Sequence, residues 1–386
     1  MKTTSTPELA EIAEKAKTWA CYDCGKCTAT CPIARVGGAL SPRRQVLAAN
    51  LGHREDIVNN NALFACLTCG LCSVRCPVGV VYGKLVQSLR QIAYHEGIEP
   101  ECPHGGALQS MMRMMAKGKT KQDRLNWLTE DLKVQQKKGE VFYWTGCTMY
   151  YDAFFPDFNI ATLDATRAAI RLLNRLGVTP VVSPDERCCG HDLLWNGDRE
   201  NFELLARHNV KLVESSSAET LVVSCAECLR TWKIDYQPFF EGSPPKIMHI
   251  TEFVAEHLDD LKFKANEEHT VTYQDPCRLG RHLGIYDPPR VLLEALPDIN
   301  LVEMPRSGRN AICCAGGTWS NCDRYAKHIQ VDRLREAKST GAEYLVTACP
   351  KCQIHFACAM KDPNLHEEIE IPMRDIATVV AEALSG

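Results

Sequence analysis

Residues 21–32 read CYDCGKCTATCP, and residues 66–77 read CLTCGLCSVRCP. Both stretches have the spacing Cys-x2-Cys-x2-Cys-x3-Cys-Pro, so the chain contains two copies of one four-cysteine run. They supply part of a total of 21 cysteines in 386 residues, a chain too long for a small disulfide scaffold. The N-terminal sequence MKTTSTPELAEIAEKAK has no apolar stretch typical of a secretion signal. We therefore expect a cytoplasmic, anaerobic protein whose reduced thiols bind metal.

The spacing of these runs is that of the [4Fe–4S] cubane ligands in bacterial ferredoxins. There, three closely spaced thiolates hold one cluster, and the fourth cysteine of each run binds the other cluster. Structural zinc is the alternative, but zinc sites use two separated pairs rather than two three-plus-one runs. We expect two cubanes, the first bound by Cys21, Cys24, Cys27 and Cys76, and the second bound by Cys66, Cys69, Cys72 and Cys31.

The chain divides by pattern into four parts. Residues 1–106 hold the two runs separated by helical stretches, which predicts an α-helical ferredoxin-like domain. Residues 107–140 are rich in Met and Lys and read as a helical connector. Residues 141–265 and 266–386 then repeat one pattern, in which short apolar runs alternate with helical segments. This alternation is typical of βαβ units and a parallel sheet, so the fold class is multidomain, with two repeated α/β cysteine-rich domains.

Each repeat carries five cysteines that follow predicted strands, where sites form in open α/β sheets. Landmarks of the two copies are offset by 130, 125 and 124 residues. Five thiols exceed the four that a cubane or a zinc ion needs, and adjacent cysteines suggest a cluster in which one sulfur bridges two irons. The first set is Cys147, Cys188, Cys189, Cys225 and Cys228, and the second is Cys277, Cys313, Cys314, Cys349 and Cys352. Three further cysteines, which we expect to be buried free thiols, are Cys102, Cys322 and Cys358.

The pattern Cys-x(n)-Cys-Cys-Gly-x(n)-Cys-x2-Cys resembles the cysteine-rich (CCG) domain of heterodisulfide reductases. Two cubane runs followed by two such domains resemble the D-type chain of that family, over roughly residues 18–360. The second copy departs from the pattern, because Ala315 follows its cysteine pair; Gly316 is expected to take over the role of the glycine. The resemblance implies that each five-cysteine set holds a noncubane [4Fe–4S] cluster. It also implies that a disulfide of two thiol coenzymes binds between these clusters and is cleaved reductively.

Several other residues are candidates for this chemistry. His191 and His282 could protonate a leaving thiolate, because histidine titrates near neutral pH. Arg278, Arg281 and Lys351 could bind an anionic coenzyme. No nucleotide-binding glycine motif is present, so flavin or NAD is expected on another subunit. The expected partners are a flavoprotein or a membrane cytochrome b, which would also provide any association with a membrane.

Composition excludes some classes of function. The formal net charge is −4, which gives no basic field for nucleic acid, and no apolar stretch is long enough to cross a bilayer. An alternative function is electron relay in a flavin dehydrogenase for glycerol 3-phosphate, glycolate or lactate, or in an electron-bifurcating or aromatic-CoA reductase complex. A purely structural metal scaffold is the third reading. We expect an oxidoreductase that is either the terminal enzyme or the electron-transfer subunit of a larger one.

Overall fold

The computed structural model describes residues 8–118, 122–265 and 267–385. These residues form two compact units that are not contiguous in sequence. Of the described residues, the first unit comprises 8–114, 190–203 and 315–330, and the second comprises 115–118, 122–189, 204–265, 267–314 and 331–385.

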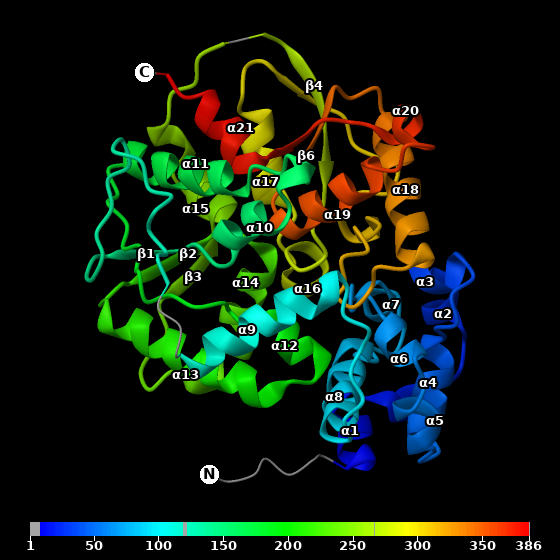
Figure 1. The fold of residues 1–386 in the computed structure, drawn as a ribbon. Coiled ribbons are helices and arrows are strands. Elements are labelled where there is room, and N and C mark those ends of the chain that lie inside the picture. Colours follow the sequence, from blue (N-terminus) through cyan, green and yellow to red (C-terminus); the bar gives the residue numbers. More distant parts are fainter. Residues whose placement is uncertain (1–7, 119–121, 266, 386) are drawn as a thin grey trace. The chain divides into compact units, whose positions relative to one another are not determined.

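The first unit is helical, as the sequence predicts. Its N-terminal part contains α1 (Leu9–Lys15), α2 (Lys26–Thr30), α3 (Pro32–Arg35), α4 (Pro42–Asn50), α5 (Arg54–Val58), α6 (Ala62–Ala65), α7 (Leu71–Val74) and α8 (Tyr82–His95), drawn in blue in Figure 1. The longest of these, α8, buries an apolar stripe that includes Leu85 and Leu89 and packs against α1. Gly25 and Gly70 each precede a short helix with φ near +77°, so the two cysteine runs share one backbone turn.

Two later segments belong to this same unit. They carry α12 (His191–Asn196) with the start of α13 (Arg199–Ser215), and the loop that leads into α18 (Arg324–Lys338). The sequence pattern places both segments within the cysteine-rich domains, whereas in the structure they group with the first unit. The physical reason is the guanidinium of Arg90, which is fully buried and needs acceptors for its donors. It donates to the carbonyl of Trp195 at 3.0 Å and to the hydroxyl of Thr318 at 3.4 Å.

The second unit contains two parallel sheets, one from each repeat. The first has the order β1 (Val141–Trp144), β2 (Thr220–Val223), β3 (Lys246–His249). The second has the order β5 (Ile299–Leu301), β4 (His269–Gln274), β6 (Tyr344–Thr347), β7 (Met373–Asp375). These sheets confirm the predicted parallel α/β character. Val181 pairs with Gln135 and Phe142 through isolated bridges outside these strands.

Four helices pack in pairs between the two repeats. Helix α11 (Thr162–Arg175) of the first repeat lies on α21 (Ile376–Glu382) of the second, and α15 (Ile250–Glu256) of the first lies on α17 (Asp287–Glu294) of the second. Figure 1 shows these four helices gathered together. An early helix of each copy thus contacts the last helix of the other, so the repeats pack with pseudo-two-fold symmetry. This unit also contains α10 (Thr148–Phe154), α14 (Ala226–Arg230), α16 (Gly280–Leu283), α19 (Pro350–Met360), α20 (His366–Ile369) and the later parts of α13 and α18.

The connector differs from its predicted form. Helix α9 (Ala107–Lys117) covers only its first third, and it ends at Gly118, whose φ is +62°. Residues 122–140 are turns and extended chain rather than helix. They are held against the first sheet because Arg124, Trp127 and Leu132 are buried there and because the Gln135 amide donates to Pro180.

Candidate metal centres

The first four-cysteine set surrounds a cavity. The cavity measures about 450 Å³ including the part open to solvent, and its lining contains the sulfurs predicted for the first cubane, with Cys72 beside them. Those lining cysteines are Cys21, Cys24, Cys27 and Cys76. The amide of Val80 donates to Cys76 Sγ at 3.3 Å, as N–H groups do around iron–sulfur clusters. Four thiols around a hollow of this size fit a cubane.

A second cavity, of about 400 Å³ measured in the same way, adjoins the other set. Its lining contains Cys31, Cys66, Cys69 and Cys72. Burial and neighbouring cysteines raise the pKa of Cys72, and burial raises that of Cys31 to about 12. Such thiols stay protonated until a metal displaces the proton. Arg90 Nη2 donates to the carbonyl of Cys66 at 2.7 Å, which places a buried cation next to this set.

The first five-cysteine set assembles at the carboxyl ends of β1 and β2. Cys147 follows β1, and Cys225 follows β2 and begins α14. Cys228 lies 3.5 Å from Cys189, sulfur to sulfur, and its thiol is also hydrogen-bonded to Cys225. Gly146 has φ +65°, and a Cβ there would lie 3.1 Å from Cys228 Sγ, so the glycine leaves room for the sulfur.

The second five-cysteine set repeats this arrangement. Cys277 follows β4, and its thiol is hydrogen-bonded to that of Cys313. Cys352 is hydrogen-bonded to both Cys314 and Cys349. All of these except the half-buried Cys277 are buried. The structure therefore brings sulfurs of each predicted set into contact, Cys189, Cys225 and Cys228 in the first set, and Cys277 with Cys313 and Cys352 with Cys314 and Cys349 in the second.

The two five-cysteine sets meet. The thiol of Cys225 is hydrogen-bonded to Cys228 in its own set and to Cys349 in the other, and these donors lower its pKa. Beside them, Lys351 Nζ lies 2.7 Å from Glu227 Oε2. The two side chains are 3% and 11% exposed, so this ion pair is shielded from water. A continuous series of thiols therefore links the two repeats across their pseudo-two-fold axis.

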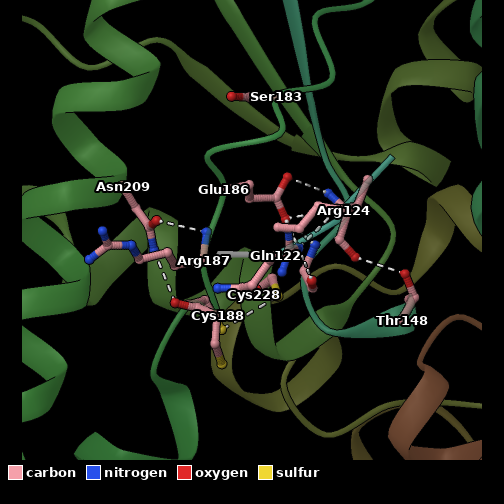
Figure 2. Close-up of polar contacts among 12 residues, drawn as sticks. Gln122, Arg124, Thr148, Ser183, Glu186, Arg187, Cys188, Asn209 and Cys228 are labelled. Atoms are coloured by element: carbon pink, nitrogen blue, oxygen red, sulfur yellow. Dashed lines mark hydrogen bonds and ion pairs between the residues drawn. The ribbon is translucent and has the colours of Figure 1, made fainter. Parts of the chain in front are cut away.

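Buried polar residues that the sequence did not reveal hold the first set. Arg124 pairs with Glu186 at 3.2 Å, and Glu186 accepts from the amides of Thr145 and Gly146 (Figure 2). Burial raises the pKa of Glu186, and Arg124 opposes that rise. This network fixes the turn that leads into Cys147. No spacing rule selects a lone Arg in a connector, which explains why it was missed.

The adjacent cysteines are held by their backbone. Asn209 donates to the carbonyl of Cys188 at 3.0 Å, as Figure 2 shows, and the Tyr236 hydroxyl donates to the carbonyl of Cys189 at 2.8 Å. The amide of Cys188 donates to Met115 Sδ at 3.3 Å. These contacts orient neighbouring side chains that would otherwise diverge.

The candidate residues outside the cysteine sets lie in defined environments. His191 is buried in the first unit, with Nδ1 3.0 Å from Asp192 Oδ1. His282 Nε2 lies 2.7 Å from Arg278 Nη1, so this nitrogen accepts a hydrogen bond, because a guanidinium can only donate. Arg281 donates to the carbonyl of Ala311.

Two sequence expectations are wrong in detail. Ala315 itself has φ +58°, close to the +71° of Gly190, while the positive φ next in the chain belongs to Gly317. The left-handed position is therefore kept at Ala315 and not passed to Gly316. Of the three cysteines outside the sets, Cys322 is exposed and Cys102 and Cys358 are half-buried, so none is fully buried.

The sequence matches two families. Residues 17–80 match the 4Fe-4S dicluster domain, and residues 141–233 and 271–357 both match the cysteine-rich domain abbreviated CCG. This chain is an iron–sulfur protein with a dicluster domain and two CCG domains. Both CCG matches contain a complete five-cysteine set, and the dicluster match contains both four-cysteine runs.

Two similar proteins are named as subunits of reductases. The D-type chain of dihydromethanophenazine:CoB–CoM heterodisulfide reductase from Methanosarcina mazei is 34% identical over 275 residues, which are 69% of this chain and 64% of the relative. The B-type chain of fumarate reductase (CoM/CoB) from Methanothermobacter marburgensis is 27% identical over 72% of this chain and 53% of its own length. The chain thus spans less than two thirds of either relative.

A solved structure has a similar fold. A hypothetical protein from Helicobacter pylori matches 90% of this chain and 68% of its own chain with a TM-score of 0.58, at 10% sequence identity. Within the described residues, no helix combines the length and the apolar character needed to cross a membrane.

Proposed function

We propose that this CCG-domain protein is the iron–sulfur subunit of a disulfide reductase. In this proposal two cubanes bind at the four-cysteine sets and two noncubane [4Fe–4S] clusters bind at the five-cysteine sets, and the substrate is a disulfide of thiol coenzymes. The observation that carries the proposal is the contact of Cys225 with Cys349. It supports two clusters close enough to act on the two sulfurs of one bond.

The chemistry balances with this number of sites. Reductive cleavage of a disulfide consumes two electrons and two protons and releases two thiols, and bound clusters supply electrons one at a time. The CCG domains would place one cluster on each side of the S–S bond. The dicluster domain would conduct electrons from a flavoprotein or a cytochrome b partner.

Other residues of the CCG domains would serve the coenzyme. Arg278 and Arg281 flank the loop after Cys277 and would hold an anionic group. Lys351 is already paired with Glu227, so in this proposal it stabilises the joint between the sets. His191 and His282 remain the candidates for proton delivery to the leaving thiolate.

Electron relay is the second candidate function. Eight of the ten thiols in the five-cysteine sets are buried. This burial favours electron relay over catalysis in an open substrate cleft. In this case the chain would pass electrons from a flavin dehydrogenase to another acceptor.

The first experiment uses the protein purified without oxygen. Reduced viologen and the heterodisulfide of coenzymes M and B are added, and dye oxidation is followed with EPR before and after each free thiol. We expect turnover and a thiol-dependent EPR signal. Cys349→Ser should abolish both and leave the cubane signals, whereas Cys322→Ser, at the exposed cysteine outside the sets, should change neither. Intact clusters without turnover or a thiol response would exclude this substrate and favour the relay.

A further inference from the structure

The two four-cysteine sets differ in exposure. In the first set Cys24 is exposed, whereas Cys31, Cys66 and Cys69 of the second set are buried. Trp19 and Tyr22, next to the first set in sequence, are 71% and 61% exposed. Electron transfer between proteins weakens steeply with distance, so a partner can approach the first set more closely.

The charge of this region differs from that of the whole chain. Residues 17–80 contain seven Lys and Arg residues against three Asp and Glu residues, although the formal net charge of the chain is −4. One of the three acids, Asp23, is paired with Arg43 at 3.3 Å. The dicluster domain is therefore a basic part of an acidic protein.

Three of these seven Lys and Arg residues line one groove, which we call the basic groove. It is an open surface hollow lined by Lys26, Thr30, Arg35, Arg75, Cys76 and Pro77 among others. Lys26, Arg35 and Arg75 are exposed. Within the part of the chain that the structure describes, no ion pair joins Lys26 or Arg35 to a carboxylate. Cys76, a predicted ligand of the first cubane, forms part of the wall.

We propose that the basic groove is the docking surface of a small electron carrier with acidic residues around its redox centre. The carrier would place that centre against Cys76 and Cys24, with its carboxylates facing Lys26, Arg35 and Arg75. Complementary charge raises the association rate and orients the encounter. The proposal rests on the electron-transfer function proposed above. It names where electrons come in, and it makes a small acidic carrier the direct donor in place of the flavoprotein or cytochrome b considered there.

The test compares two triple variants of the full anaerobic protein. Lys26→Gln, Arg35→Gln and Arg75→Gln together neutralise the basic groove. An acidic plant-type [2Fe–2S] ferredoxin serves as the probe, and its affinity and its rate of cluster reduction are measured. We expect the groove variant to lose about tenfold in affinity and rate at low salt. Raising the salt concentration from about 50 mM to about 500 mM should remove the difference between the groove variant and the unaltered protein, because salt screens exposed charges.

The matched control removes the same charge elsewhere. Lys137→Gln, Lys138→Gln and Lys211→Gln change three exposed lysines outside the dicluster domain, and we expect less than about a twofold effect on ferredoxin binding. Equal losses in both triple variants would overturn the proposal, because they would show a response to net charge alone. The proposal would also be overturned if the groove variant lost binding to anionic phospholipid vesicles but bound ferredoxin as before. That result would favour a membrane as the surface that docks on the groove.

Two measurements separate docking from the proposed reductase function. The EPR spectrum after dithionite reduction reports the clusters without a protein donor, and viologen-driven disulfide turnover bypasses the groove. Both should be unchanged in the groove variant. If the triple variant loses its clusters, the single change Lys26→Glu on the short helix α2 replaces it. An unaltered ferredoxin affinity in that variant would then refute the proposal.

Discussion

Glu227 and Lys351 occupy the same position in the two repeats, and they form an ion pair 2.7 Å long with each other. Each lies two residues after the first cysteine of its Cys-x2-Cys motif, at the same 124-residue offset as Cys225 and Cys349. Equivalent positions meet only near a pseudo-two-fold axis. If the repeats were identical in sequence, like charges would meet there, so the opposite charges make the two halves complementary.

This pair should be essential for the joint between the five-cysteine sets. Lys351→Gln would remove the cation that faces the buried Glu227, and breaking such a pair costs about 3–5 kcal/mol. We expect loss of the EPR signals of the proposed noncubane clusters, with retention of those of the proposed cubanes. The double exchange of Glu227→Lys with Lys351→Glu should restore most of the lost stability and signal.

An exposed ion pair in the same unit provides the control. Lys246 and Glu256 lie 2.6 Å apart with side chains 59% and 51% exposed, and Lys246→Gln should cost less than about 1 kcal/mol. Guanidinium-induced loss of cluster absorbance under anaerobic conditions measures both effects. A double exchange as unstable as the single variant would show that pairing is not what matters at this position.

The buried guanidinium of Arg90 should stabilise the dicluster domain and tune the reduction potential of the cubane proposed at the second four-cysteine set. It donates to the carbonyls of Leu63, Phe64 and Cys66. Arg90→Lys keeps the charge but not the planar set of donors, and should cost about 2–4 kcal/mol. Arg90→Gln also removes the charge, so redox titration by EPR should show a lower reduction potential for one cubane, because reduction adds negative charge. The exposed Arg54, which is paired with Glu96, provides a control. Arg54→Gln should change neither the stability nor the reduction potential. Equal potentials in the Lys and Gln variants would refute the charge effect.

The sequence predicted what regular spacing encodes. Cysteine runs at fixed intervals and alternating apolar segments predicted the helical N-terminal part, the parallel sheets and the grouping of the thiols. The buried polar residues were missed because burial depends on distant partners: Arg90 on α8 reads as a solvated helix residue until Trp195, 105 positions away, accepts its hydrogen bond. The Glu227–Lys351 pair had a usable signal, since opposite charges stand at equivalent repeat positions.

The residue after each cysteine pair offers a matched pair of substitutions. Gly190 and Ala315 both adopt left-handed backbone conformations. This conformation costs an alanine roughly 1–2 kcal/mol, while the extra freedom of glycine in the unfolded chain costs about 0.4–1 kcal/mol. Ala315→Gly should therefore stabilise the protein by up to about 1 kcal/mol, and Gly190→Ala should destabilise it by a similar amount. Anaerobic guanidinium unfolding measures both, and destabilisation by Ala315→Gly would show that the alanine methyl contributes packing that outweighs the strain.

Asp375 should make the stability of the CCG domains depend on pH. Burial raises the pKa of its carboxyl to about 7 from an ordinary value of 3.8. The folded state therefore holds this proton more tightly than the unfolded state, and the resulting stabilisation is complete below pH 3.8 and is lost as the pH rises through 7. Between about pH 5.5 and about pH 8 the free energy of unfolding should fall by about 2 kcal/mol from this group.

Asp375→Asn isolates that contribution. In the folded protein the Asp375 carboxylate caps α21 by accepting from the backbone amide of Ala377 at 2.9 Å, and an asparagine oxygen can still accept this hydrogen bond. The side-chain amide of Gln353, which donates to Asp375, can rotate to face the new NH₂ group. In this variant the free energy of unfolding should no longer fall by about 2 kcal/mol across this pH range. The exposed Asp259 is the control, because Asp259→Asn should leave the pH dependence as it is. A wild-type slope in Asp375→Asn would mean that other groups, and not this carboxyl, set the pH response.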